Sequence, residues 1–152
     1  FNTYMNILRM IGEKRMNKLI IASHGTLSEG LVNSAQFIIG KLENVEYITA
    51  YVDPDTDYED LIKNLVANFD YENGSLIVAT DIVGGSVNSE FTNYLHKYPF
   101  YLVSGVNLVT VISLATMLNE EVNSETIKQT IEDAQSTIVF CNELINDQKE
   151  DF

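Results

Sequence analysis

Short apolar runs alternate with amphipathic segments along most of this chain. Runs rich in β-branched and aliphatic residues predict four strands, at 18–23, 45–52, 75–80 and 100–104. Apolar residues at helical spacing predict helices at about 27–41, 57–69, 87–96, 108–118 and 124–145. Because helices connect successive strands, the sheet should be parallel. We therefore expect an α/β fold, a three-layer α/β/α sandwich with a mainly parallel four-stranded sheet and space for an additional edge strand.

The last predicted helix carries an apolar stripe along one face. Its residues lie three or four positions apart and should pack against the domain: Ile127, Ile131, Ala134, Ile138, Cys141 and Ile145. Cys141 is the only cysteine, so no internal disulfide can form. We expect a buried, unreactive thiol and a reducing, cytoplasmic compartment.

Length and charge narrow the range of functions. The 152 residues fit one domain, which we place at 16–152 because Met16 closely precedes the first strand. Residues 1–15 are interpreted as a leader or an upstream extension. The 22 acidic and 9 basic residues give a net charge of −13, which disfavours nucleic acid and anionic membranes as partners. No apolar stretch approaches the roughly 18 residues that span a bilayer, so direct membrane insertion is not expected.

Two polar side chains stand where predicted strands end. His24 follows the apolar run of the first strand and precedes Gly25, and Asp81 directly follows the third strand. Open α/β sheets bind ligands at the edge formed by the carboxyl ends of their parallel strands. There Asp81 could accept a hydrogen bond from one ring nitrogen of His24 and leave the other free to attack. A turn or a helix cap is the alternative role for Asp81.

A glycine-rich loop, Gly84-Gly85-Ser86, lies between Asp81 and the next predicted helix. Backbone amides at a helix start favour a bound phosphate, which makes Gly84 and Gly85 candidate phosphate-binding residues. Ser86 is either an ordinary N-cap or an N-cap that also donates its hydroxyl to a phosphoryl oxygen.

The start of the helix after His24 offers further hydrogen-bond donors. Thr26 and Ser28 could contact a phosphate there or simply cap the helix, and Gly25 would let the backbone approach a ligand. The second histidine, His96, is placed near a helix C-terminus, where the helix dipole favours a cation. With two histidines in the whole chain, neither a metal site nor a cofactor is expected.

These groups are sufficient for a phosphohistidine carrier. Phosphoryl transfer depends mostly on positioning and charge stabilisation, so it needs few residues. The sequence contains neither a lysine-bearing nucleotide loop nor a GxSxG elbow. An alternative of another class is a binding module whose glycine loop holds an anion without covalent chemistry.

Three segments also carry a resemblance to a known family: 20–25 (IIASHG), 80–88 (TDIVGGSVN) and 104–108 (SGVNL). Together they resemble the IIA component of the mannose/fructose/sorbose class of the bacterial sugar phosphotransferase system (PTS). Valine stands at 87 and 109, where the family usually has proline; both positions begin predicted helices, where proline is tolerated rather than required.

The resemblance implies a role for each candidate residue. His24 would accept a phosphoryl group from the histidine phosphocarrier protein and pass it to a IIB component for sugar uptake. Asp81 would hydrogen-bond the active histidine, and Ser86 would be the active-site serine. Asn107 would shape the same sheet edge. The resemblance also implies a homodimer, although the short polar tail after Ile145 disfavours the exchanged C-terminal strand of the best-known type.

Two rival functions share the fold and the histidine. One is the phosphocarrier subunit of dihydroxyacetone kinase, and the other is a IIA-like domain of a transcriptional regulator. The glycine loop after Asp81 resembles the sugar-transport type more than the kinase subunit.

Overall fold

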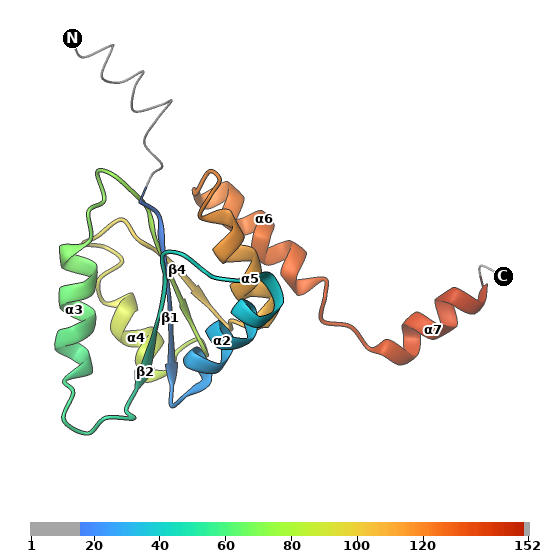
Figure 1. Cartoon of the computed structure of the whole chain (residues 1–152), viewed down its shortest axis with the longest axis horizontal. Coiled ribbons are helices and arrows are strands. Elements are labelled where there is room, and N and C mark those ends of the chain that lie inside the picture. The colour runs from blue at the N-terminus through green and yellow to red at the C-terminus, as the bar shows by residue number, and fades with distance from the viewer. Residues whose placement is uncertain (1–15, 151–152) are drawn as a thin grey trace, which may run out of the picture.

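Four parallel strands form one sheet in the order β2-β1-β3-β4 (Figure 1). The structure is a computed structural model that describes residues 16–150, with side chains for 16–145, so the predicted leader at 1–15 lies outside the described residues. The strands are β1 (Lys18–His24), β2 (Val45–Ala50), β3 (Leu76–Thr80) and β4 (Tyr101–Ser104). The helices are α2 (Leu27–Ile39), α3 (Tyr58–Asn68), α4 (Ser86–Thr92), α5 (Leu108–Met117), α6 (Ser124–Gln135) and α7 (Cys141–Glu150).

Alternation of side chains along the strands divides the core into two layers. β1 directs Leu19 and Ile21 to the face covered by α2, α5 and α6 (Figure 1). It directs Ile20 and Ala22 to the opposite face, which α3 and α4 cover. All five residues of β3 are buried, since both faces of an inner parallel strand are covered. This double burial explains the continuous apolar runs of the sequence, and it confirms the predicted three-layer α/β sandwich.

The edge strand β2 is shorter than the sequence pattern predicts. It ends at Ala50, whereas the predicted strand continues to Val52. Tyr51 has a φ of +66°, which turns the backbone out of the extended region and ends the pairing with β1 at His24 and Ala50. Within residues 16–150 no fifth strand pairs with β2 or β4, so the additional edge strand is not found there.

The predicted helix at 87–96 also ends early. α4 stops at Thr92, whose hydroxyl donates to the Asn88 carbonyl at 2.8 Å, and the chain continues in turns. The amide of Tyr94 bonds back to Phe91, three residues earlier, as in a tightened helix end. His96 is therefore exposed in a turn after α4, and its predicted place at a helix C-terminus is wrong.

The single helix predicted at 124–145 is wrong, because residues 136–140 separate α6 from α7. The Ser136 hydroxyl donates to the Asp133 carbonyl and the Thr137 hydroxyl to the Ala134 carbonyl, each at 2.6 Å. Hydroxyls that bond nearby carbonyls compete with the helical pattern, and the β-branched run that follows has weak helix propensity. α6 therefore ends at Gln135.

The break changes the surroundings of the apolar stripe. Ile127 and Ala134 are buried, as predicted, but α7 projects away from the sheet and its helices (Figure 1). Ile138 is 74% exposed and Ile145 is 56% exposed. Cys141 is exposed as well, so its predicted burial is wrong.

A variant of Gly74, which precedes β3, tests the packing at the end of the sheet away from His24. Gly74→Ala should destabilise the fold by about 1–3 kcal/mol, because the new methyl group would lie 2.6 Å from the Met16 carbonyl carbon. Gly30→Ala is the matched control: its methyl group would meet no atom within 4 Å, and alanine in a helix should stabilise by about 0.5–1 kcal/mol. Urea unfolding measures both; equal effects of the two variants would contradict this packing.

Candidate functional site

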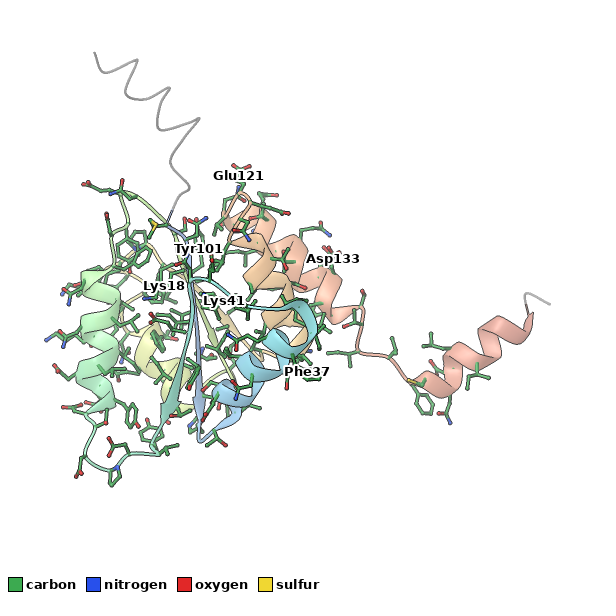
Figure 2. All side chains as sticks on the ribbon, viewed as in Figure 1. Lys18, Phe37, Lys41, Tyr101, Glu121 and Asp133 are labelled. Atoms are coloured by element: carbon green, nitrogen blue, oxygen red, sulfur yellow. The ribbon has the colours of Figure 1, made fainter. Side chains whose placement is uncertain are left out.

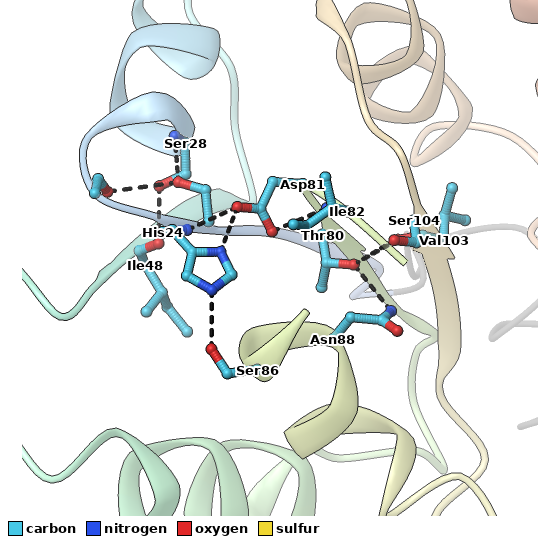
Figure 3. A network of polar contacts seen from close by, with 12 residues as sticks. His24, Ser28, Ile48, Thr80, Asp81, Ile82, Ser86, Asn88, Val103 and Ser104 are labelled. Atoms are coloured by element: carbon cyan, nitrogen blue, oxygen red, sulfur yellow. Dashed lines mark hydrogen bonds and ion pairs between the residues drawn. The ribbon is translucent and has the colours of Figure 1, made fainter. Parts of the chain in front are cut away.

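Two neighbouring strands, β1 and β3, place His24 and Asp81 next to each other. β1 and β3 pair in register with Ala22 opposite Thr80, so His24 and Asp81 leave the sheet side by side. Asp81 Oδ2 accepts hydrogen bonds from the backbone amide of His24 at 2.9 Å and from its ring nitrogen Nδ1 at 2.7 Å (Figure 3). Asp81 Oδ1 accepts the Ile82 amide at 3.0 Å. One carboxylate thus holds both the backbone and the imidazole of His24.

This contact determines which ring nitrogen carries the proton. A carboxylate only accepts hydrogen bonds, so Nδ1 of His24 is the protonated nitrogen and Nε2 of the neutral ring keeps its lone pair. The Ser86 hydroxyl lies 2.9 Å from Nε2 and can donate to it (Figure 3). The nitrogen with the free electron pair therefore faces a hydroxyl at the mouth of the site.

Burial differs sharply between the two partners. The side chain of Asp81 is 8% exposed, and that of His24 is 39% exposed. Burial alone would raise the pKa of Asp81, but the hydrogen bonds from the His24 amide and ring and from the Ile82 amide, with the attraction of His24, outweigh it. The pKa of Asp81 is therefore held below its ordinary value of 3.8. The carboxylate stays ionised at neutral pH, while the ring that it orients remains accessible.

The glycine loop brings Ser86 to the histidine by close packing. A methyl group on Gly85 would lie 3.1 Å from Cε1 of His24 and 2.9 Å from the Ile82 side chain. Gly85 is also the N-cap of α4, so the prediction of Ser86 as the N-cap is wrong; Ser86 is the first helical residue, and its hydroxyl is free to face the imidazole. The Gly84 amide donates to Asn88 Oδ1 and the Gly85 amide to the Ile82 carbonyl, so both amides are engaged within the loop.

A buried polar network beneath this loop was not anticipated from the sequence. The side chain of Asn88 is buried; its Oδ1 accepts the Gly84 amide, and its Nδ2 donates to the Thr80 hydroxyl at 3.0 Å. The Thr80 hydroxyl donates to the Ser104 hydroxyl at the end of β4 (Figure 3). The available signal was Thr80, a polar residue at the end of an otherwise apolar strand. These bonds hold the loop to two strands.

Among the described residues, the donors proposed at the start of α2 make no hydrogen bond to the imidazole, whose ring nitrogens contact Asp81 and Ser86. Thr26 occupies the N-cap position without a side-chain capping bond, and Gly25 has a φ of +61° with its amide bonded to the Ala50 carbonyl. Ser28 is buried and its hydroxyl donates to the Ile48 carbonyl at 2.8 Å, so it neither caps the helix nor reaches a ligand.

Asn107, in the turn after β4, caps the start of helix α5. Its Oδ1 accepts the amide and the hydroxyl of Thr110 at the start of α5, at 2.9 and 2.8 Å. Its side chain thus fixes the turn after β4.

Among the described residues no group of three or more histidine, cysteine, aspartate or glutamate side chains could hold a metal ion. No helix within that span is long and apolar enough to cross a membrane.

Residues 18–135 match the family model described as the PTS system fructose IIA component. A Klebsiella pneumoniae structure, described as a phosphoenolpyruvate-dependent sugar phosphotransferase system permease, is 36% identical, with a TM-score of 0.79 over 88% of this chain and 96% of that one. The PTS IIA protein associated with the fucose utilization operon of Streptococcus pneumoniae is 21% identical (TM-score 0.71; 85% and 96% covered). The mannose/sorbose specific IIA subunit from Enterococcus faecalis is 24% identical (TM-score 0.65; 82% and 93% covered). At 21% and 24% identity, the similarity to the last two structures shows a shared fold and nothing further.

The lowered pKa of Asp81 predicts how an isosteric variant responds to pH. Because this pKa is lower in the folded than in the unfolded chain, the ionised carboxylate stabilises the fold above the unfolded value of about 3.9, and the contribution is lost as pH falls through the folded value. Asp81→Asn should therefore cost about 1–3 kcal/mol at neutral pH, the usual range for a hydrogen-bonded charged group.

Urea unfolding of the wild type and Asp81→Asn measures this difference. It should shrink as the pH falls below about 5 and vanish below the lowered folded pKa of Asp81, where the carboxylate is protonated in both states. A difference that stays constant or grows in acid would contradict the lowered pKa.

Proposed function

The chain belongs to the PTS fructose IIA component family, and from this premise we propose that it relays a phosphoryl group through Nε2 of His24. The observation that carries the proposal is the 2.7 Å hydrogen bond that Nδ1 of His24 donates to Asp81, in a side chain that remains 39% exposed. That bond orients the imidazole and leaves Nε2 as the nucleophile. The proposed phosphotransferase is of the mannose/fructose/sorbose type and needs no cofactor.

The proposed donor is a phosphohistidine on the histidine phosphocarrier protein. The lone pair of His24 Nε2 attacks phosphorus, a new N–P bond forms, and the donor's N–P bond breaks with its electron pair returning to the donor's imidazole. The phosphorylated ring of His24 keeps its proton on Nδ1 and carries a positive charge, which the Asp81 carboxylate balances. No proton has to move during this step.

The second half of the relay reverses the first. The nucleophile of a IIB component attacks phosphorus, and the electron pair of the N–P bond returns to Nε2 of His24. In both steps the hydroxyl of Ser86, 2.9 Å from Nε2 in the free protein, can turn to a phosphoryl oxygen and donate to it. This exchange would take place in the cytoplasm and serve sugar uptake.

Phosphorylation with purified components tests the proposal. Incubated with phosphoenolpyruvate, enzyme I and the histidine phosphocarrier protein, the wild type should acquire a phosphate that is labile in acid and stable in base. His24→Ala should abolish this label, because the attacking nitrogen is gone. His96→Ala is the matched control and should be labelled like the wild type, since His96 is exposed in a turn after α4.

Each contrary outcome selects another explanation. A wild-type protein without label would favour the non-covalent anion-binding module, and a label that persists in His24→Ala would remove His24 as the acceptor. Onward transfer to a IIB component, compared with transfer to a dihydroxyacetone kinase, separates the sugar system from the kinase subunit. A labelled protein that passes phosphate to neither would favour the regulatory domain.

We further infer a homodimer, from the apolar side chains of the C-terminal segment. Residues 138–140 (Ile-Val-Phe) are 74%, 47% and 64% exposed and, with α7, stand away from the sheet (Figure 1). Contiguous exposed apolar residues of this kind favour a protein interface. On α2, Phe37 is 94% exposed and points outward (Figure 2), which offers a second apolar surface to another copy of the chain.

Charged substitutions in this segment should separate the two copies. Light scattering of the wild type should give twice the 17.1 kDa mass of one chain, whereas the double variant Ile138→Asp/Phe140→Asp should give the single mass. Asn142→Asp is the control, because it adds charge to the same segment without removing an apolar side chain. A wild type with the mass of one chain would contradict the dimer.

A further inference from the structure

Tyr51 has a backbone conformation that aromatic residues rarely adopt. Its φ is +66°, and within residues 16–150 only one other non-glycine residue, Asn44, has a positive φ. Asparagine tolerates this region because its short polar side chain bonds locally, whereas a bulky side chain is disfavoured there. Such strain persists only when the surroundings impose it, and it is concentrated at functional sites.

Hydrogen bonds on both sides of Tyr51 impose the strained conformation. The hydroxyl of Tyr58 donates to the Thr49 carbonyl at 3.0 Å and accepts the Asp53 amide at 3.2 Å. It thus joins the residues two positions before and two positions after Tyr51. The ring of Tyr58 also meets that of Tyr51 edge to face, with 5.5 Å between centroids. The turn is held by a side chain from α3.

Core packing does not account for the strain. Tyr51 is 58% exposed, so the conformation does not serve to bury its ring. Instead it places the ring beside the reactive histidine, with 5.7 Å between the centroids of Tyr51 and His24 and an angle of 38° between the planes. Tyr51 and Ser86 also line the same open pocket of about 230 Å³. The strained residue therefore contributes to the surroundings of Nε2.

The contacts of the imidazole change when Nε2 is occupied. In the free protein Asp81 holds Nδ1 and Ser86 holds Nε2. As phosphorus approaches Nε2, the Ser86 hydroxyl turns from the nitrogen to a phosphoryl oxygen, so the hydrogen bond to Asp81 is the one that still holds the ring itself. The ring of Tyr51, at aromatic contact distance, is a neighbour that limits rotation of the imidazole about this bond.

We propose that Tyr51 is a positioning residue for phosphoryl transfer: its ring, placed by the strained backbone, keeps Nε2 of His24 aligned with the incoming phosphorus. This inference rests on the proposed function and adds a residue to it. Alignment acts on the transfer step, so loss of the ring should lower kcat and leave the KM for the phosphocarrier protein unchanged. Because the contact is between the two rings, phenylalanine should replace tyrosine.

Three variants of Tyr51 separate the ring from the backbone strain. Tyr51→Phe keeps both, Tyr51→Ala keeps the strain without the ring, and Tyr51→Gly removes both. Tyr51→Ala and Tyr51→Gly should each lower kcat about tenfold, within the range for small misplacements of reacting atoms, while Tyr51→Phe stays near the wild type. Tyr51→Gly should melt about 2–6 °C above Tyr51→Ala, because glycine relieves the strain. Asn44→Gly, at the other positive-φ residue, should leave kcat unchanged.

An NMR measurement adds a readout that a purely structural role would not move. Long-range nitrogen–proton spectra of His24 should show one ring conformation in the phosphorylated wild type and in Tyr51→Phe, and exchange broadening in Tyr51→Ala. Unchanged kcat in Tyr51→Ala, a raised KM with unchanged kcat, or an unaltered His24 spectrum in that variant would each overturn the inference. A wild type that is never phosphorylated would instead overturn the proposed function, so the two failures remain distinguishable.

Discussion

The hydrogen bond between Asp81 and Nδ1 of His24 is the interaction on which the site depends. It forms because β1 and β3 are adjacent parallel strands with Ala22 opposite Thr80, so that Asp81, directly after β3, lies beside the last residues of β1. The same carboxylate oxygen accepts the backbone amide of His24, so one atom sets the position of both the chain and the ring. A register shift of one residue in either strand would turn one partner to the other face of the sheet and remove the contact.

Buried polar contacts, rather than apolar packing, hold the loop that completes the site. Asn88 bonds the Gly84 amide and the Thr80 hydroxyl, and Thr80 bonds Ser104 on the next strand. Buried groups of this kind are costly to leave unpaired, so the network favours one loop conformation. The absence of a side chain on Gly85 then lets this loop approach the imidazole. An accessible ring nitrogen thereby lies above a network of buried hydrogen bonds.

The strained backbone of Tyr51 and the partly exposed ring of His24 both lie at the carboxyl end of the sheet. At the opposite end, Asn17 is buried, and its side chain bonds the Leu118 carbonyl and the Ser75 amide, contacts that stabilise without offering chemistry. Residues that fold the domain and residues of the candidate site are thus separated along the strands, as is usual in parallel α/β folds.

The sequence by itself determined the order of strands and helices, the α/β fold and the family, and it indicated His24, Asp81 and Ser86 as candidates, because these depend on local apolar patterns and short motifs. It did not reveal Tyr51 or Asn88, whose contacts come from segments that meet only after the sheet has formed. It also predicted one continuous helix at 124–145, since apolar spacing cannot show whether a surface is present to receive the stripe. Only the tertiary structure decided the distances at the sheet edge, because strand register and side-chain hydrogen bonding between distant residues set them.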